Sequence, residues 1–205
     1  MAAVQAGSFT VKVALVTGGS KGIGESIVRR LASDGAAVAF TYSSSEEKAR
    51  QLVRGILLMG TVDNFSLEDF DRMIAVNVRA AFVGIQSAAQ QMSDGGRIIL
   101  IGSNTAIRTA FPGGSIYSMT KAALTGLVRG AAIDLAPRAI TVNNIQPGPT
   151  MTDMSGAHAV LVKNLIPLKR MGDVSEIAGF VAYPASHEAG FITGASLTID
   201  GGYVA

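Results

Sequence analysis

Three polar side chains stand close together along the chain, and their types suit proton transfer to or from an oxygen atom. Ser103, Tyr117 and Lys121 supply a hydroxyl, a phenol and an ammonium. Tyr117 and Lys121 are four residues apart, so on a helix they share one face, where an ammonium is near enough to influence a phenol. If a strand end and a helix start bring Ser103 to the same point, the three groups predict a site for acid–base chemistry.

A strand, a loop and a helix are needed to position these groups. The apolar run 97–101 follows Gly95 and Gly96 and predicts a strand that ends just before Ser103. From Ser115 to about Ala136, a pattern with many small residues predicts a helix that carries both the phenol and the ammonium and ends at Pro137.

A glycine-rich turn near the start of the sequence predicts a second kind of site. The apolar run from Val11 to Val16 leads into TGGSKGIG at 17–24, and a helical pattern follows with Ile23, Ile27 and Leu31 on one face. Glycines in such a turn let backbone amides approach a pyrophosphate at the start of a helix. Taken alone, the motif is also compatible with a turn that needs glycine only for its backbone geometry.

The end of the next predicted strand bears on which dinucleotide fits. Ala36 to Tyr42 predicts a strand whose end carries Thr41, Tyr42 and Ser43, with no carboxylate. A carboxylate there would bind a free 2′-hydroxyl and repel a 2′-phosphate, so these residues, with Lys21 in the glycine turn, favour NADP over NAD. The serines are equally compatible with an ordinary polar loop in which Ser45 caps a helix.

The other segments alternate between helix and strand. The stretch 46–59 is ambiguous: a helix to about Arg54, or a helix that passes into a strand over Leu52–Met59. Alternating helices and apolar strands predict a parallel sheet with helices on both faces. The further expected elements are a helix from the N-cap Ser66 to about Met92 with Asn77 inside its apolar stripe, a strand over Ala139–Ile145, a helix from the capping box at Asp173 to Tyr183 before Pro184, and a strand over Ser196–Asp200.

Composition excludes several other classes of function. At 205 residues, with 48% apolar and 16% charged residues, the chain is expected to form a single globular domain over 1–205. It has no cysteine and only His158 and His187, so we expect no metal site. A net charge of +2 without long basic blocks gives no indication of nucleic-acid binding. The first residues lack the order of a signal peptide, and no window of about 18 apolar residues occurs, which predicts a cytoplasmic protein outside the membrane.

Taken in order, these motifs resemble the short-chain dehydrogenase/reductase family over nearly the whole chain. The C-terminal stretches ITVNNIQPG, PLKRMGDVSEIA and ITGASLTIDGGY are similar to its 3-oxoacyl-[acyl-carrier-protein] reductase-like branch. The family's TGxxxGxG turn, helix asparagine, serine and YxxxK motif are matched by Thr17, Gly18, Gly22 and Gly24, by Asn77, by Ser103, and by Tyr117 and Lys121.

The resemblance implies a Rossmann-type doubly wound sheet and an oxidoreductase that moves a hydride between NADP(H) and a carbonyl or alcohol substrate. Tyr117 would be the general acid/base, Lys121 together with the nicotinamide would lower the pKa of Tyr117, Ser103 would bind the substrate oxygen, and Asn77 would hold a relay water. Family members usually form tetramers, so a homotetramer or dimer is expected. The implied cofactor contacts are Gly18, Ser20, Lys21, Gly22, Ile23, Gly24, Tyr42, Ser43, Tyr117, Lys121, Pro147, Gly148, Thr150 and Thr152.

One large departure from the family lies between Tyr42 and Ser66. Family members have here a third strand, a helix and a fourth strand that ends in NNAG, and none of these is recognisable. Loss of the fourth strand leaves a gap of about two strand spacings, each roughly 4.8 Å, next to the first strand. A tolerated deletion, a defective gene product, and residues absent from the sequence between 43 and 60 all explain the departure; the last would separate a pair such as Arg54 and Gly55.

Two other functions therefore stay open beside the reductase. The first is a non-catalytic nucleotide-binding regulator of the cyclic-di-GMP type, because some relatives that resemble this branch are regarded as such regulators and a fold does not fix a function. The second is an inactive remnant of the family. The substrate itself cannot be read from the sequence; the apolar segment Thr150–Leu168 is expected to close over it.

Overall fold

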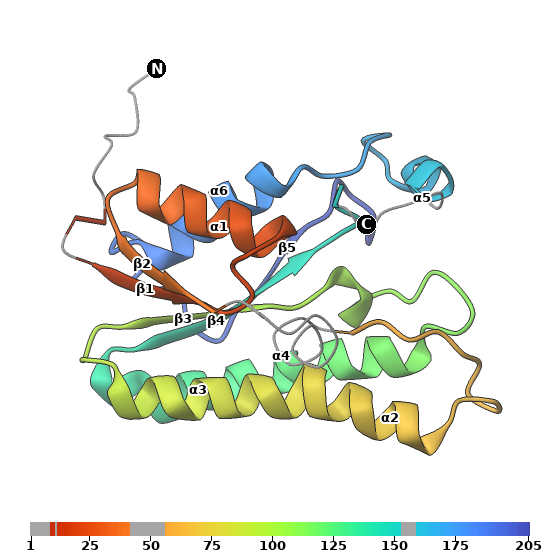
Figure 1. Cartoon of the computed structure of the whole chain (residues 1–205), viewed down its shortest axis with the longest axis horizontal. Helices are drawn as coiled ribbons and strands as arrows, with labels where there is room; N and C mark the ends of the chain where they lie inside the picture. Colours follow the sequence, from red (N-terminus) through yellow and green to blue (C-terminus); the bar gives the residue numbers. More distant parts are fainter. Residues whose placement is uncertain (1–8, 11, 42–55, 153–158) are drawn as a thin grey trace.

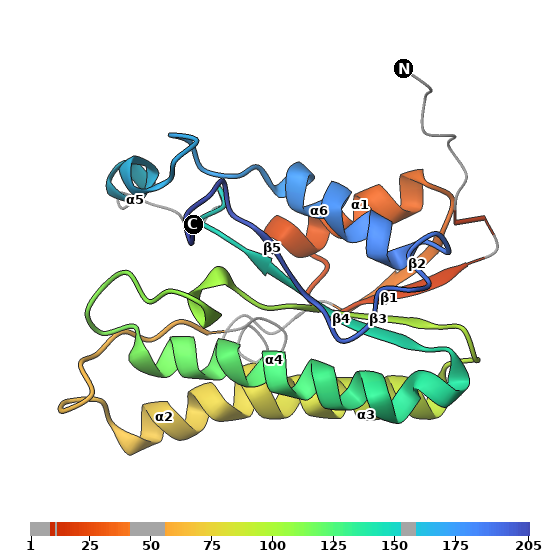
Figure 2. The ribbon, with the colours of Figure 1, turned by 180° about the vertical axis from the view of Figure 1, so that it is seen from behind.

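Helices cover both sides of a central layer of parallel strands (Figures 1 and 2). The structure is a computed structural model, and it describes residues 9–10, 12–41, 56–152 and 159–205. Its strands are β1 Val13–Val16, β2 Ala37–Phe40, β3 Arg97–Ile101, β4 Thr141–Pro147 and β5 Ser196–Ile199. Its α-helices are α1 Gly22–Ser33, α2 Leu67–Ile74, α3 Ala80–Gln91, α4 Ser115–Leu135, α5 Ala159–Leu165 and α6 Val174–Ala185.

The strands form two parallel sheets instead of one. β1 pairs with β2, with Val13 opposite Ala37, and β3, β4 and β5 pair in that order. No strand among the described residues joins β1 to β3, as expected from the missing fourth strand. The proposed chain break at Arg54, and most of the alternative strand over 52–59, lie outside the described residues; 56–59 are described and are not a strand.

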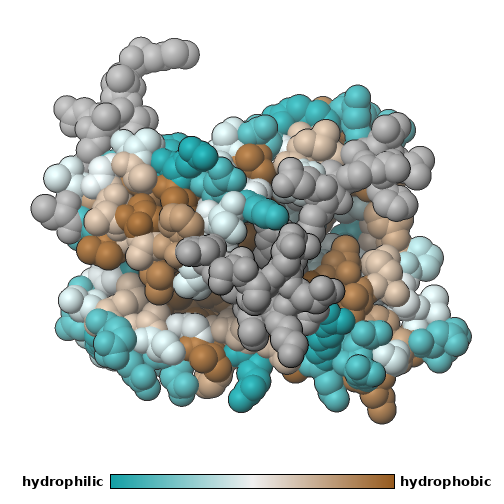
Figure 3. Space-filling model, in the orientation of Figure 1, coloured by the Kyte–Doolittle hydropathy of each residue, from teal (hydrophilic) through white to brown (hydrophobic). Residues whose placement is uncertain are grey.

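The two sheets differ in how completely they are covered. Every residue of β4 is buried, which is typical of a strand with helices on both faces. In β1 only alternate residues pack against the core below α1 and α6, while Val13 is 81% and Leu15 is 70% exposed. Apolar side chains accordingly gather on the surface over the β1–β2 pair (Figure 3), where Phe40 is also exposed.

Two apolar cores hold the layers together. The first joins α1 and α6 to the strands and includes Ile27, Leu31, Ile145, Ile177 and Val181. The second joins α3 and α4 to β3 and β4 from the other side and includes Ile85, Ile98, Val128, Ile140 and Val142. The strand ends that carry polar residues are thereby held between two helical layers (Figures 1 and 2).

Most helix ends follow their sequence signals. The Ser66 side chain accepts a hydrogen bond from the amide of Asp69, and Asp173 forms the expected capping box with Glu176. The predicted long helix from Ser66 is continuous but consists of α2, a π-helical turn over Ala75–Arg79 and α3. The irregular turn includes Asn77, and π-helical turns are often found at functional sites.

Several predicted boundaries differ from the structure by one or two residues, and two of these differences have local causes. The helix α6 does not end near Tyr183 but includes Pro184 and ends at Ala185. Pro184 has no N–H for the carbonyl four residues earlier, so it costs the helix one hydrogen bond. The helix ends one residue later, where the Ser186 amide donates to the Tyr183 carbonyl. The strand β4 begins at Thr141 and not at Ala139, because Ala139 has a left-handed backbone with φ of 52° and ends a short 3₁₀ turn.

Candidate functional site

The carboxyl ends of β1, β3 and β4 carry the residues that the sequence singled out. The glycine turn follows β1, Ser103 follows β3, and Gly148 follows the last residue of β4, Pro147. In parallel sheets, ligands bind outside the carboxyl ends of the strands. The predicted site therefore lies where this fold provides a binding crevice.

The structure brings Ser103, Tyr117 and Lys121 together. Ser103 hydrogen bonds to the Tyr117 phenol, and the Lys121 ammonium lies 5.6 Å from the centre of the Tyr117 ring. Lys121 is only 6% exposed and donates to the Ile101 carbonyl at 3.5 Å, so its position is set by the end of β3. The hydroxyl, phenol and ammonium thus meet as their spacing predicted.

A neighbouring threonine orients the Ser103 hydroxyl. The Ser103 oxygen accepts from the Thr105 amide at 3.2 Å and from the Thr105 hydroxyl at 3.0 Å. A serine hydroxyl has two acceptor sites and one hydrogen, so these two bonds leave its own hydrogen to be donated. Thr105, which sequence reasoning did not single out, thereby makes Ser103 a donor toward the phenol.

Burial dominates the protonation of the phenol and the ammonium. Burial raises the pKa of Tyr117 above its usual value, and the hydrogen bond from Ser103 opposes this rise. Burial also lowers the pKa of Lys121 to about 8. In the chain without a cofactor, desolvation of the phenolate is the largest effect on the pKa of Tyr117. The expectation that Lys121 together with the nicotinamide lowers this pKa stays a prediction.

Asn77 is engaged by its own chain. Its side-chain oxygen accepts from the Ile56 amide at 2.7 Å, and its NH₂ group donates to the Ile56 carbonyl at 2.9 Å and to the Thr120 hydroxyl at 3.1 Å. Thr120 in turn donates to the Tyr117 carbonyl at 2.7 Å. The amide therefore ties Ile56 to the helix that carries the phenol, and the relay water at Asn77 stays a prediction.

The glycine turn has the geometry that close approach of a phosphate requires. Gly18 and Gly22 have φ of 72° and 53°, and a Cβ on Gly24 would collide with the Gly18 carbonyl. The amide of Gly18 donates to the Thr41 hydroxyl at the end of β2. At the start of α1, Lys21 makes no side-chain cap, so the first amides of the helix are not occupied by that residue.

Some of the remaining predicted cofactor residues lie beside the glycine turn, and others lie elsewhere or outside the described residues. Thr150 donates to the Gly148 carbonyl at 2.9 Å, and the Thr152 methyl group lies 3.7 Å from the point where a Cβ of Gly22 would be. The loop after β4 therefore reaches the glycine turn, beside a hollow of about 330 Å³. Ser20 is exposed and Ile23 packs into the first core, whereas Tyr42 and Ser43 lie outside the described residues.

The described part of the chain contains no group of three or more His, Asp or Glu side chains placed to hold a metal ion. None of its helices combines the length and the apolar character needed to cross a bilayer.

The parallel strands, the glycine turn and the Ser–Tyr–Lys cluster define a Rossmann-type α/β protein. The family model described as short chain dehydrogenase matches residues 12–57, and the model described as Enoyl-(Acyl carrier protein) reductase matches residues 52–204. The chain belongs to the short-chain dehydrogenase/reductase family.

Three relatives show how far the likeness extends. A protein of Escherichia coli strain K12 named cyclic-di-GMP-binding biofilm dispersal mediator protein is 37% identical, with 96% of this chain and 99% of the relative covered. The structure of a short-chain dehydrogenase/reductase from Serratia marcescens BCRC 10948 has a TM-score of 0.90 at 45% identity and covers 97% of this chain and all of that one. A short-chain dehydrogenase from Burkholderia cenocepacia J2315, solved in complex with NADP, has a TM-score of 0.87 at 37% identity, covering 98% and 99% of the two chains.

The alignment with the E. coli relative also includes positions that this chain lacks. The alignment with the E. coli relative runs over 234 positions, so at least 29 positions of that relative have no counterpart in the 205 residues of this chain. The two family models change over at residues 52–57, within the region where the sequence departs from the family pattern. A missing segment of this size agrees with the loss of a strand–helix–strand unit.

Proposed function

We propose that the protein is an NADP(H)-dependent oxidoreductase that interconverts a carbonyl compound and its alcohol. The observation that supports this most directly is the cluster of Ser103, Tyr117 and Lys121 at the carboxyl end of β3, where the buried Lys121 lies 5.6 Å from the centre of the Tyr117 ring and donates to the Ile101 carbonyl. When bound, the nicotinamide supplies or accepts the hydride. Tyr117 donates a proton to the substrate oxygen during reduction and removes it during oxidation.

The neighbours of Tyr117 adjust this proton transfer. Ser103 donates its hydroxyl hydrogen to the oxygen on which negative charge develops, because Thr105 occupies its acceptor sites. Lys121 is protonated below about pH 8 and then places a positive charge near the phenol. Asn77 fixes the chain near Thr120 and holds the water that we expect to connect Lys121 to solvent.

The cofactor is assigned to the groove between the glycine turn and the loop after β4. Gly18, Gly22 and Gly24 would admit the phosphates, and Gly148 and Thr152 would face them from the opposite loop. The end of β2 at Thr41 presents no carboxylate to oppose a 2′-phosphate, and the B. cenocepacia relative was solved with NADP. These observations support a preference for NADP(H) over NAD(H).

The same proposal includes the setting of the enzyme. We infer a single cytoplasmic domain that assembles as a homotetramer or dimer through the faces of α3 and α4. Apolar side chains on these helices support the contact, because Phe82 and Val83 are about half exposed and Ile133 is 76% exposed. Size-exclusion chromatography with light scattering tests this part by itself; a monomer at micromolar concentration would contradict it.

The activity is tested by a panel of ketones with NADPH and with NADH. We expect NADPH oxidation with at least one ketone, faster than with NADH, and loss of this activity in Tyr117→Phe. Tyr183→Phe is the matched control, since Tyr183 lies half exposed on α6 outside the site and should leave the rate unchanged. A panel on which wild type and Tyr117→Phe are equally slow would refute the proposed chemistry.

A nucleotide-binding regulator is the second candidate, and one observation favours it. The E. coli relative that covers 96% of this chain is named for binding cyclic-di-GMP and for biofilm dispersal. Calorimetry with cyclic-di-GMP distinguishes the two functions: binding that persists in Tyr117→Phe, without ketone reduction, would favour the regulator. An inactive remnant of the family would bind neither NADPH, NADH nor cyclic-di-GMP.

A further inference from the structure

The ends of β3, β4 and β5 meet at one aspartate. Asn104, the residue after Ser103, is 3% exposed and donates its side-chain NH₂ to Asp200 Oδ2 at 3.2 Å. Asp200 directly follows β5 and lies 96 positions from Asn104 in the sequence. This hydrogen bond therefore joins the loop of the catalytic serine to the C-terminal turn.

The Asp200 carboxylate also organises the C-terminal turn itself. Oδ1 accepts from the Gly202 amide at 3.0 Å, and Oδ2 accepts from the Val204 amide at 3.1 Å. With Asn104, three N–H groups converge on one carboxylate, and hydrogen bonds to an ionised acceptor are stronger than those between neutral groups. Asp200 is therefore held in one orientation.

The loop after β4, which begins at Gly148 and is called the cofactor loop below, passes directly over the contact between Asn104 and Asp200. A Cβ on Gly148 would collide with Asp200 Cβ and would lie 3.3 Å from the Asn104 NH₂ group. The amide of Gly148 donates to the Ile199 carbonyl, so the loop is also bonded to the end of β5. Only a residue without a side chain fits between Asp200 and the chain after Pro147.

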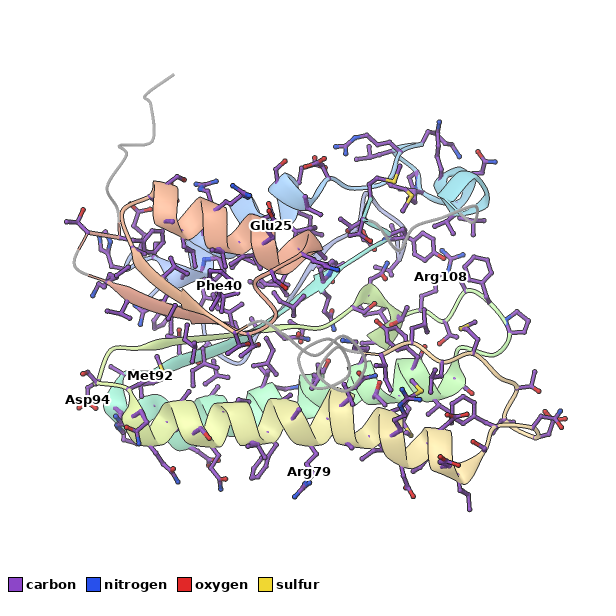
Figure 4. All side chains as sticks on the ribbon, in the orientation of Figure 1. Glu25, Phe40, Arg79, Met92, Asp94 and Arg108 are labelled. Carbon is purple, nitrogen blue, oxygen red and sulfur yellow. The ribbon has the colours of Figure 1, made fainter. Side chains whose placement is uncertain are left out.

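A second contact joins the same two segments. Arg108 donates to the Tyr203 carbonyl at 2.6 Å and lies over the Tyr203 ring at 5.3 Å from its centre. Arg108 extends from the loop between β3 and α4 (Figure 4), and its amide donates to the Asn104 carbonyl. The serine loop is thus attached to the C-terminal turn at both Asn104 and Arg108.

We propose that Asp200 is a positioning residue that fixes Ser103 relative to Gly148, and so aligns the proton-donating site with the cofactor loop. Its effect on catalysis rests on the proposed function. The alignment itself exists in the chain with or without turnover. The link runs from Asp200 through Asn104 to Ser103 on one side, and through backbone contact to Gly148 on the other.

A pair of side-chain exchanges tests the junction. In Asp200→Asn, one oxygen becomes an NH₂ group that faces an N–H donor, and in Asn104→Asp two carboxylates face each other across the 3.2 Å contact. We expect each change to lower kcat with the best ketone by about 10- to 100-fold, the range for a hydrogen bond to a charged group. In the double variant Asn104→Asp/Asp200→Asn, the side-chain pair bonds again with donor and acceptor exchanged. The Val204 amide then faces the new NH₂ group and loses its acceptor, so we expect part of kcat to return and kcat to exceed that of either single variant.

A readout that does not depend on turnover keeps the test decisive. The hydrogen bond from Ser103 lowers the pKa of Tyr117, so displacement of Ser103 raises that pKa further. Titration of the full chain labelled with ¹³C-tyrosine, with Tyr117→Phe to assign the resonance, should show this rise in both single variants and its partial reversal in the double variant.

One control and two distinct outcomes separate the positioning role of Asp200 from the proposed oxidoreductase function. Asp94→Asn is the control, because this exposed carboxylate lies just before β3 (Figure 4), at the opposite end of the strand from Ser103. Its partner is Arg138, at 2.8 Å. If both single variants lose only melting temperature while the pKa of Tyr117 stays at its wild-type value, the positioning role is overturned. A wild-type chain that reduces no ketone would overturn the proposed function, whereas the pKa of Tyr117 would still report on Asp200.

Discussion

Replacement of Asn77 by alanine is expected to lower the free energy of unfolding by about 3 kcal/mol. The amide is 4% exposed and makes three hydrogen bonds, two to the backbone of Ile56 and one to Thr120. A buried intramolecular hydrogen bond contributes a net value of about 1 kcal/mol. Ile56 is only partly buried, so water can hydrogen bond to the Ile56 N–H and carbonyl when the Asn77 amide is removed. We therefore add no further free-energy penalty for unpaired buried groups.

Equilibrium unfolding in urea measures this difference at neutral pH. Asn77→Asp is informative beside it, because a carboxylate keeps the bond from the Ile56 amide but has no hydrogen for the Ile56 carbonyl or for Thr120. Asn64→Ala is the matched control, since the exposed Asn64 bonds only within its own turn and should cost less than about 0.5 kcal/mol. A loss below about 1 kcal/mol in Asn77→Ala would refute the view that its amide anchors Ile56.

Three further predictions concern single side chains. Because the folded pKa of Lys121 is about 8 and its ordinary value is 10.5, the unfolded chain binds more protons between these pH values. The free energy of unfolding should therefore rise with pH in this window, and Lys121→Met should abolish the rise while stabilising the protein at pH 7 in urea titrations. Gly24→Ala should abolish NADPH binding in calorimetry, because its methyl group collides with the Gly18 carbonyl, whereas Gly84→Ala, which meets nothing within 4 Å, should bind normally. Ser66→Ala should cost about 1 kcal/mol through loss of the cap at Asp69, and an unchanged urea midpoint would contradict this.

Most helices and strands were predicted from caps and residue spacings, because these signals depend only on residues a few positions apart. Ser66 and Asp173 cap helices as expected, since a cap needs only amides two or three positions away. The four-residue spacing of Tyr117 and Lys121 placed both on one face of α4. Boundaries failed where backbone geometry intervened, as at Ala139 with its positive φ and at Pro184 in the last turn of α6.

Long-range contacts were beyond sequence reasoning. Asp200 and Asn104 contact each other only because three strands end at one place. No local sequence pattern at either residue indicates this contact. The partner of the Asn77 amide, Ile56, likewise depends on how the chain passes α2. The sequence also does not quantify burial, which raises the pKa of Tyr117 in the chain without a cofactor.

The glycine turn and Ser103 lie on two separate hydrogen-bonded units, β1–β2 and β3–β4–β5. In the described parts of the chain, β1–β2 is aligned with β3–β4–β5 through packing of α1 on α6, including Ile27, Leu31, Ile177 and Val181. Apolar packing has no preferred direction and weakens on cooling, and packed helices slide by small shear motions, whereas a backbone ladder fixes register. We therefore expect the position of the glycine turn relative to the Tyr117 phenol to change with temperature and pressure. A ligand that contacts both Gly22 and Lys121 would hold the two units in one relative position.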